Sequence, residues 1–125
     1  MANPILVVDD EADLVTTYER LLRRQGHRVL SAGTCRAGLA VIQMEPLSLV
    51  IADLRLPDGD GLEVVRAARA LSTPPPVLVA TGLASRTARQ AALAAGASAF
   101  LAKPFATEVL SRLVSELLGG RDAPG

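Results

Sequence analysis

The chain has 125 residues, a length typical of one domain, and its 13 basic and 13 acidic residues give a formal net charge of zero. This balance argues against a nucleic-acid-binding surface, which normally needs a basic stripe. With one cysteine, no visible signal peptide and no apolar run near the roughly 20 residues of a membrane span, we expect a cytoplasmic protein without membrane contact.

Strand and helix patterns alternate five times along the chain. The first strand covers about residues 4–9 and leads into a helix that ends at Gly26. The expected inward residues of this helix are Leu14, Tyr18, Leu21 and Leu22. A second strand at about 28–31 precedes a helix that Thr34 can cap, and a third strand covers about 47–53. The expected inward residues of the second helix are Ala37, Val41 and Met44.

The second half of the chain opens with a loop at residues 56–61 that is dense in turn-forming residues. A third helix presents Leu62, Val65 and Ala68, and three consecutive prolines at 74–76 prevent its continuation. Further elements are expected at 77–81 (strand), 85–95 (helix) and 99–102 (strand). The last helix follows Pro104, and its expected inward residues are Leu110, Leu113, Val114 and Leu117.

Nearly continuous apolar strands separated by helices indicate an α/β fold, with a parallel sheet covered on both faces. Five such units favour a doubly wound, flavodoxin-like sheet of order 2-1-3-4-5 with five helices. We expect one domain over residues 1–118, and a flexible tail or the start of a linker over residues 119–125. Ligands in such sheets bind at the carboxyl ends of the strands, beside the point where the strand order reverses.

Polar residues follow the strands at this edge: Asp9 and Asp10 after the first strand, Asp53 after the third, Thr81 at the end of the fourth, and Lys103 after the fifth. Gathered carboxylates need a cation, and Mg²⁺, which prefers oxygen ligands, is the appropriate one. A carboxylate beside Mg²⁺ can act as ligand or as nucleophile in phosphoryl transfer. The Lys103 ammonium and the Thr81 hydroxyl are candidate partners for phosphoryl oxygens.

Each of these residues also has an ordinary structural interpretation. Asp10 fits the cap of the following helix, and Thr81 could also be a cap. Asp53 alone would be a solvated turn residue, and Lys103 before a proline would be a surface lysine. The functional interpretation is favoured because all four strand ends carry chemically complementary groups.

Four segments resemble the signature segments of the receiver domain of two-component response regulators, in order and with the family's spacing, and the resemblance covers about residues 4–118. They are Val7-Val8-Asp9-Asp10-Glu11, the segment from Asp53 to Gly61, Ala80-Thr81-Gly82, and the segment from Gly96 to Phe105. A departure is Phe100, which stands where Tyr is frequent in the family.

The resemblance implies that Asp53 is the phosphoacceptor and that Asp9, Asp10, Asp53 and the backbone carbonyl of Arg55 hold Mg²⁺. It implies that Thr81 and Lys103 contact the phosphoryl group, that Thr81 and Phe100 move as a switch, and that the Lys103–Pro104 peptide bond is cis.

The resemblance also implies a sensor histidine kinase or phosphotransfer protein as phosphodonor, and a homodimer through the fourth helix, fifth strand and fifth helix as a possible partner contact. In this interpretation the domain is a regulatory phosphoacceptor in a signalling phosphorelay, and not an enzyme. An alternative is a magnesium-dependent phosphohydrolase of the haloacid dehalogenase type, although its motif needs an Asp two residues after the nucleophile, where Arg55 stands. A second alternative is a pseudo-receiver that is not phosphorylated and acts as an interaction module.

Overall fold

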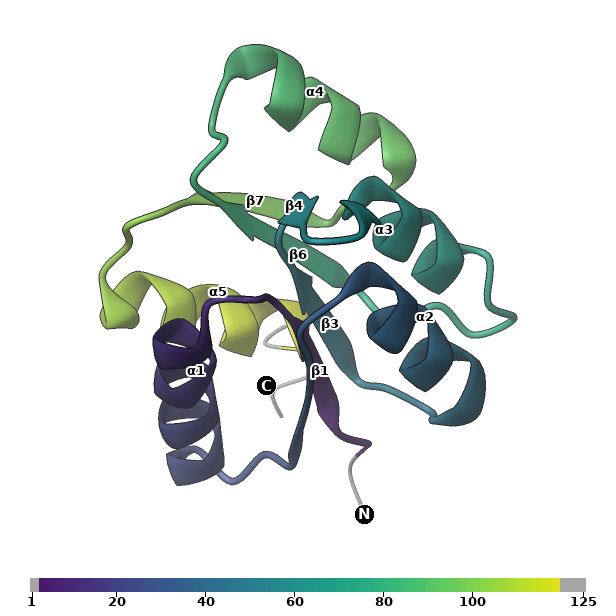
Figure 1. The fold of residues 1–125 in the computed structure, drawn as a ribbon. Helices are drawn as coiled ribbons and strands as arrows, with labels where there is room; N and C mark the ends of the chain where they lie inside the picture. Colours follow the sequence, from purple (N-terminus) through teal and green to yellow (C-terminus); the bar gives the residue numbers. More distant parts are fainter. Residues whose placement is uncertain (1–2, 120–125) are drawn as a thin grey trace.

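A five-stranded parallel sheet with helices on both faces forms the centre of the computed structural model, which describes residues 3–119 (Figure 1). The sheet strands are β1 (Ile5–Val8), β2 (Val29–Ala32), β3 (Leu49–Ala52), β6 (Val77–Thr81) and β7 (Ala99–Ala102). The helices are α1 (Ala12–Arg24), α2 (Cys35–Met44), α3 (Leu62–Arg69), α4 (Arg86–Ala95) and α5 (Thr107–Leu117). The strand order β2-β1-β3-β6-β7 confirms the predicted 2-1-3-4-5, because β6 and β7 are the fourth and fifth strands of this sheet.

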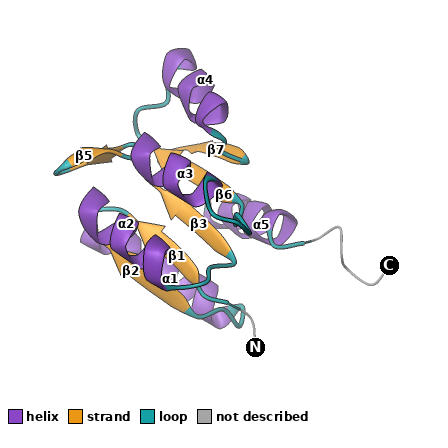
Figure 2. Cartoon of the chain, turned by 90° about the vertical axis from the view of Figure 1, so that its right-hand side faces the viewer, coloured by secondary structure: helices purple, strands orange, loops and turns teal. Residues whose placement is uncertain are grey.

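Alternation along the strands divides the interior into two cores, one on each face of the sheet. Leu6 and Val8 of β1 pack into the core under α2, α3 and α4, whereas Ile5 and Val7 pack into the core under α1 and α5. Figures 1 and 2 show the two layers of helices with the sheet between them. Both faces of a parallel sheet are thus covered, which is why β1, β3 and β6 are buried along their whole length.

The predicted helix boundaries are confirmed to within a few residues, and Thr34 caps the second helix as expected. The Thr34 hydroxyl accepts a hydrogen bond from the Ala37 amide (3.0 Å), and the Ser85 hydroxyl accepts one from Ala88 (3.0 Å). The helix before Gly96 ends there because Gly96 has a φ of 114°, a conformation that other residues rarely adopt. Helix α5 buries Leu110 and Val114 and packs Leu113 and Leu117 against the same core, as predicted.

The predicted inward face of α2 is confirmed only for Val41, which packs against the core, and is wrong for Ala37 and Met44, which are exposed. Met44 is 79% exposed, and the buried residues of the helix are Cys35, Gly38 and Ile42. The reason is the close approach at Gly38, where an added Cβ would lie 2.9 Å from a methyl of Val8. A glycine contributes nothing to a hydrophobic pattern, so the periodicity does not reveal the face on which α2 approaches the sheet most closely.

A small antiparallel hairpin, β4 (Arg55–Leu56) with β5 (Gly59–Asp60), occupies most of what the sequence indicates as a loop. At its base, the Gly61 amide donates to the Leu54 carbonyl (2.8 Å). A Cβ on Gly61 would overlap the carbonyl oxygen of Asp53, so only glycine fits at this position without a shift of backbone. The chain therefore returns tightly upon itself directly after β3.

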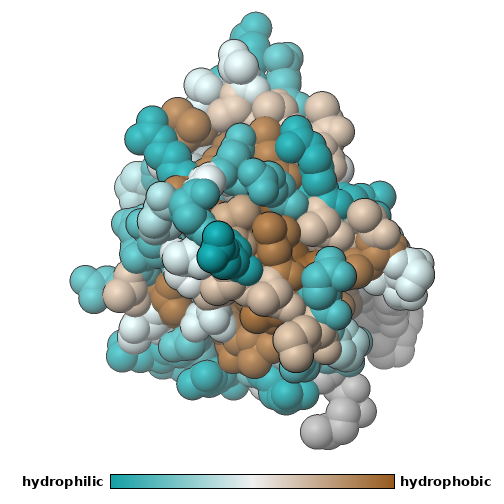
Figure 3. Space-filling view, turned by 45° about the vertical axis from the view of Figure 1, so that its right-hand side comes forward, coloured by the Kyte–Doolittle hydropathy of each residue, from teal (hydrophilic) through white to brown (hydrophobic). Residues whose placement is uncertain are grey.

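On the face drawn in Figure 3, apolar and polar side chains are interspersed. Among residues 3–119, no helix combines the length and apolar character needed to cross a bilayer. The predicted tail at 119–125 lies outside the described residues, apart from Gly119.

Candidate functional site

The site lies at the carboxyl edge of the sheet, where the strand order reverses between β1 and β3. Backbone hydrogen bonds extend the ladder one residue past three strands: the Asp9 amide donates to Ala32 (2.9 Å), Asp53 to Val8 (3.0 Å) and Lys103 to Thr81 (2.9 Å). These bonds hold Asp9, Asp53 and Lys103 in sheet register. Side-chain alternation therefore continues through them, and all three point to the α1–α5 side of the sheet edge.

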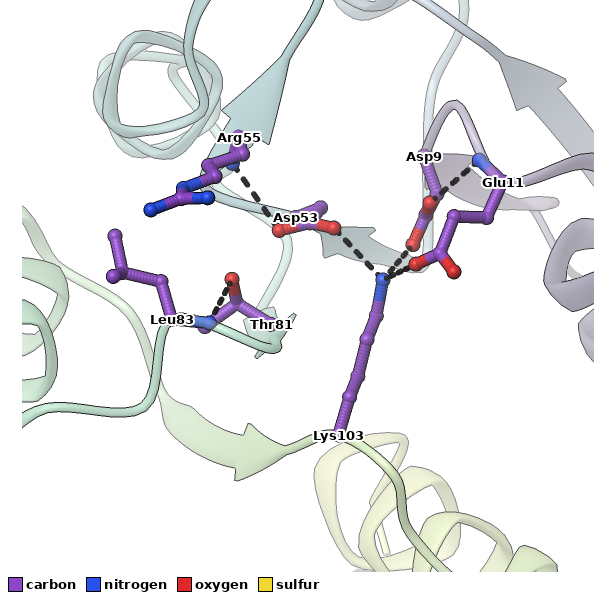
Figure 4. A network of polar contacts seen from close by, with 7 residues as sticks. All are labelled: Asp9, Glu11, Asp53, Arg55, Thr81, Leu83 and Lys103. Carbon is purple, nitrogen blue, oxygen red and sulfur yellow. Dashed lines mark hydrogen bonds and ion pairs between the residues drawn. The ribbon is translucent and has the colours of Figure 1, made fainter.

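Lys103 joins three carboxylates at one point (Figure 4). Its Nζ lies 2.7 Å from Oδ2 of Asp9, 2.7 Å from Oδ2 of Asp53 and 2.7 Å from Oε1 of Glu11. The side chains of Lys103, Asp9 and Asp53 are 10%, 2% and 8% exposed, whereas Glu11 is 60% exposed. The interpretation of Lys103 as a surface lysine is therefore wrong.

The two buried carboxyls differ in their acidity. Burial raises the pKa of Asp9, and the hydrogen bond from Lys103 and the amide of Glu11 only partly oppose it. Burial is the largest single influence and acts to raise the pKa of Asp53, but the hydrogen bonds from Lys103, from Thr81 and from the Arg55 amide together outweigh it, so this pKa lies below its ordinary value. The Asp53 carboxyl is thus held ionised at neutral pH. For Lys103, burial opposes the charge, but the three carboxylates raise its pKa.

Asp9, Asp10 and Asp53 can each offer a carboxylate oxygen within 4.8 Å of the others. Oxygen donors of this kind, with no His or Cys among them, suit a hard cation such as Mg²⁺ and not zinc. Asp10 is exposed, and among the described residues α1 has no side-chain cap, its N-cap being Glu11. The interpretation of Asp10 as a helix cap is therefore wrong, and its carboxylate stays available to a cation.

A cavity of about 550 Å³ opens beside these carboxylates. Asp10, Asp53, Arg55 and Thr81 are among the residues that line it. The amide of Arg55 donates to Oδ1 of Asp53 (3.2 Å), which fixes the carboxylate from the side opposite Lys103. An anion that entered this cavity would meet the Asp53 carboxylate and the Thr81 side chain together.

Thr81 ends β6 and lines the cavity together with Asp53, whereas Phe100 lies on β7 in the core under α4. Thr81 follows Val77 and Val79 in alternation and is 1% exposed, and its hydroxyl accepts a hydrogen bond from the Leu83 amide (3.1 Å). This local bond makes Thr81 part of the turn after β6, while Ser85 caps α4. Phe100 packs against the core under α4, and the guanidinium of Arg89 lies 5.8 Å from the centre of its ring.

The structure therefore brings Asp9, Asp10, Asp53 and Lys103 together, places Arg55 and Thr81 on the same cavity, and sets Phe100 apart on β7. The Lys103–Pro104 peptide bond is cis, as the resemblance implies. Sequence reasoning misses Glu11 as the third partner of Lys103. The position of Glu11, two residues after Asp9 and directly before α1, indicates from the sequence that its carboxylate lies near the same sheet edge.

A family model described as the response regulator receiver domain matches residues 5–115. The chain is 36% identical over 100 residues to the photosynthetic apparatus regulatory protein RegA of Rhodobacter capsulatus, covering 80% of this chain and 54% of that protein. It is 39% identical over 101 residues to the KDP operon transcriptional regulatory protein KdpE of Escherichia coli, covering 81% of this chain and 44% of that protein. The chain thus spans about half the length of the curated relatives it matches.

Solved structures give the same result. A CheY-like receiver domain protein from Methanospirillum hungatei superposes with a TM-score of 0.91, at 31% identity and with 100% of both chains covered. The signal receiver domain of a Luxo repressor protein from Vibrio parahaemolyticus has a TM-score of 0.88 at 26% identity, covering 94% of this chain and 91% of that one. With the matched residues spanning nearly the whole chain, the protein belongs to the response regulator receiver domain family.

Proposed function

We propose that this receiver domain takes a phosphoryl group onto Asp53 from a phosphohistidine on a sensor histidine kinase or phosphotransfer protein. In this step a carboxylate oxygen of Asp53 attacks phosphorus. The bond between phosphorus and the histidine nitrogen breaks, its electron pair returns to the imidazole, and an acyl phosphate forms on Asp53. The single observation that carries the proposal is the position of Asp53, whose carboxylate is ionised, contacts Lys103 and lies within the acidic cluster.

The chain's own residues prepare this step in three ways. Lys103 and the Arg55 amide hold the two oxygens of Asp53 from opposite sides, which orients the nucleophile. The lowered pKa of Asp53 keeps it unprotonated. Lys103 is close enough to pass from the carboxylate to a phosphoryl oxygen, where its charge offsets the negative charge of the transferred group.

Mg²⁺ would be held by Asp9, Asp10, Asp53 and the backbone carbonyl of Arg55, and when bound it supplies positive charge to the phosphoryl oxygens. The acidic cluster supports this assignment, because its donors are all oxygens and Asp10 has no other role in the described structure. In the proposed role the domain accepts one phosphoryl group per cycle and is not a multiple-turnover enzyme.

Phosphorylation would shift a pre-existing equilibrium between two conformations, with Thr81 and Phe100 as the switch. A shift from mostly off to mostly on needs about 5 kcal/mol of differential stabilisation. New contacts from the Thr81 hydroxyl and Lys103 to the phosphoryl group are the proposed source. The output surface would be α4, β7 and α5, which a second copy of the chain or an output domain could bind. The receiver unit is proposed to extend over residues 1–118.

The test uses acetyl phosphate with Mg²⁺ and the purified chain. We expect a phosphoprotein peak by mass spectrometry for the wild type and for Asp13→Asn, a control on the exposed start of α1, and none for Asp53→Asn. Uptake by Asp53→Asn at the wild-type level would contradict the proposal. Repeated turnover of a general phosphatase substrate would instead favour the phosphohydrolase alternative, and a wild type that neither binds Mg²⁺ nor takes up phosphate would favour the pseudo-receiver.

A further inference from the structure

Asp58 lies at the tip of the β4–β5 hairpin and caps a helix from which it is distant in the sequence. Its Oδ1 accepts a hydrogen bond from the amide of Cys35 (2.7 Å), and its Oδ2 accepts one from the amide of Arg36 (2.9 Å). These two amides begin α2, 23 and 22 residues before Asp58. The carboxylate therefore spans the first two helical N–H groups with both of its oxygens.

Two side chains divide the capping of α2 between them. Asp58 serves Cys35 and Arg36, while the hydroxyl of Thr34 serves Ala37 (3.0 Å) and the Thr34 carbonyl accepts from the Gly38 amide (3.0 Å). The two side chains thus bond the amides of all three residues of the first helical turn, and the bond from Gly38 to Thr34 is the first one within the helix itself. Thr34 is a local cap, and Asp58 is the part of the cap that comes from another element. Hydrogen bonds from Arg36 and Cys35 lower the pKa of Asp58, so the carboxylate is charged at neutral pH.

The hairpin that Asp58 ties down is the same segment that presents Arg55 to the acidic site. Arg55 pairs with Asp60 in the hairpin. The base of the hairpin is fixed by the bond from Gly61 to Leu54 (2.8 Å). The tip is fixed by Asp58. Arg55 therefore lies between two anchors, and its backbone can shift only if one of them gives way.

We propose that Asp58 is a positioning residue for the metal site: by tying the hairpin tip to the start of α2, it sets the place of the Arg55 carbonyl and thereby the affinity of the site for Mg²⁺. This inference rests on the proposed function, in which that carbonyl is a ligand. Mg²⁺ requires nearly ideal octahedral geometry with short bonds, so a displacement of one ligand by a few tenths of an ångström weakens binding. Residues that orient metal ligands without touching the metal commonly act in this way.

The test measures the affinity for Mg²⁺ alone by calorimetric titration of the wild type, Asp58→Ala, Asp58→Asn and Thr34→Ala. Asp58→Ala is expected to raise the Kd by about tenfold, the lower end of the effect of residues that support metal ligands. Asp58→Asn is also uncharged but keeps one acceptor oxygen, so an intermediate Kd is expected. Thr34→Ala removes the other cap of the same helix without touching the hairpin, and its Kd should equal that of the wild type although both cap variants lose thermal stability.

Three results would overturn the inference. If Asp58→Ala binds Mg²⁺ with the same Kd as the wild type, the hydrogen bonds between Asp58 and α2 do not act on the metal site. Equal Kd values for Asp58→Asn and Asp58→Ala would assign the effect to charge instead of to hydrogen bonding. If Thr34→Ala weakens Mg²⁺ binding as much as Asp58→Ala does, the effect comes from the stability of α2 alone. If the wild type itself binds no Mg²⁺, the proposed metal site fails, and this outcome is distinct from the other three.

Discussion

Replacing Lys103 by methionine, which keeps the length of the side chain and removes its charge, is expected to destabilise the metal-free domain strongly. Asp9 and Asp53 are 2% and 8% exposed and would lose their shared cation. Removal of one member of a buried ion pair costs about 3–5 kcal/mol, because a charge is left buried without a partner. We take about 3 kcal/mol, since the cavity beside Asp53 admits water. For a domain of this size that corresponds to a fall in Tm of about 12 °C.

The assay is urea unfolding followed by circular dichroism in EDTA, repeated from pH 7 down to pH 4.5. Lys103 is the largest influence that lowers the pKa of Asp9 and Asp53, so both pKa values rise in the variant. A carboxyl whose folded pKa exceeds its unfolded value opposes folding at neutral pH, and this cost disappears as the pH falls through the folded pKa. The difference in unfolding free energy between wild type and variant should therefore narrow as the pH falls.

Mg²⁺ supplies a second check, because it can replace the missing ammonium as the counter-charge. Saturating Mg²⁺ should stabilise Lys103→Met by more than it stabilises the wild type. Glu11→Gln is the matched control: Glu11 is 60% exposed, and such ion pairs contribute about 0.5 kcal/mol or less. The reasoning would be refuted if Lys103→Met lowers the free energy of unfolding by less than about 1 kcal/mol in EDTA at pH 7. It would also be refuted if the difference in unfolding free energy between wild type and variant does not become smaller at lower pH.

Three further predictions test local features. Tyr18 is fully buried, and its hydroxyl has no hydrogen-bond partner within residues 3–119. Tyr18→Phe should therefore raise the free energy of unfolding by about 1 kcal/mol in urea titrations, whereas a lower free energy of unfolding would show that the hydroxyl has a partner. Gly61→Ala should cost about 3 kcal/mol or more through backbone overlap, whereas Gly33→Ala, with no atom within 4 Å of the added methyl, should stay within about 0.5 kcal/mol of the wild type. Arg89→Met should cost about 0.5 kcal/mol and shift the ring proton resonances of Phe100, and unchanged resonances would count against the cation–π contact.

Much of the fold can be predicted because its signals are local. The boundaries of β6 and β7 match the predicted 77–81 and 99–102, since each strand is an apolar run between residues that break structure. The main site residues can be predicted for a topological reason. Parallel strands place their carboxyl ends at one edge, so Asp9, Asp53 and Lys103 meet once the strand order is known.

The features that the sequence does not reveal depend on contacts between distant elements. The inward face of α2 follows from the approach of Gly38 to Val8, and a glycine leaves no mark in a hydrophobic pattern. Asp58 looks like an ordinary turn residue, because its role appears only when the hairpin lies against a helix 22 residues earlier. From the sequence, Glu11 looks like an ordinary acidic residue at the start of a helix, and only the fold brings its carboxylate into contact with Lys103.

The pleat of the sheet has a consequence for which insertions and deletions this domain can tolerate. Within β6, Val77 and Val79 face the core under α4, whereas Leu78 and Ala80 face the core under α1 and α5. One extra residue within β6 would turn the Thr81 side chain away from the cavity that it lines with Asp53, and it would exchange the two cores for every residue after the insertion in that strand. The same residue added between α3 and β6, in the stretch 70–76, would leave the alternation intact. The site therefore depends on the exact number of residues in each strand as well as on the side chains at the strand ends.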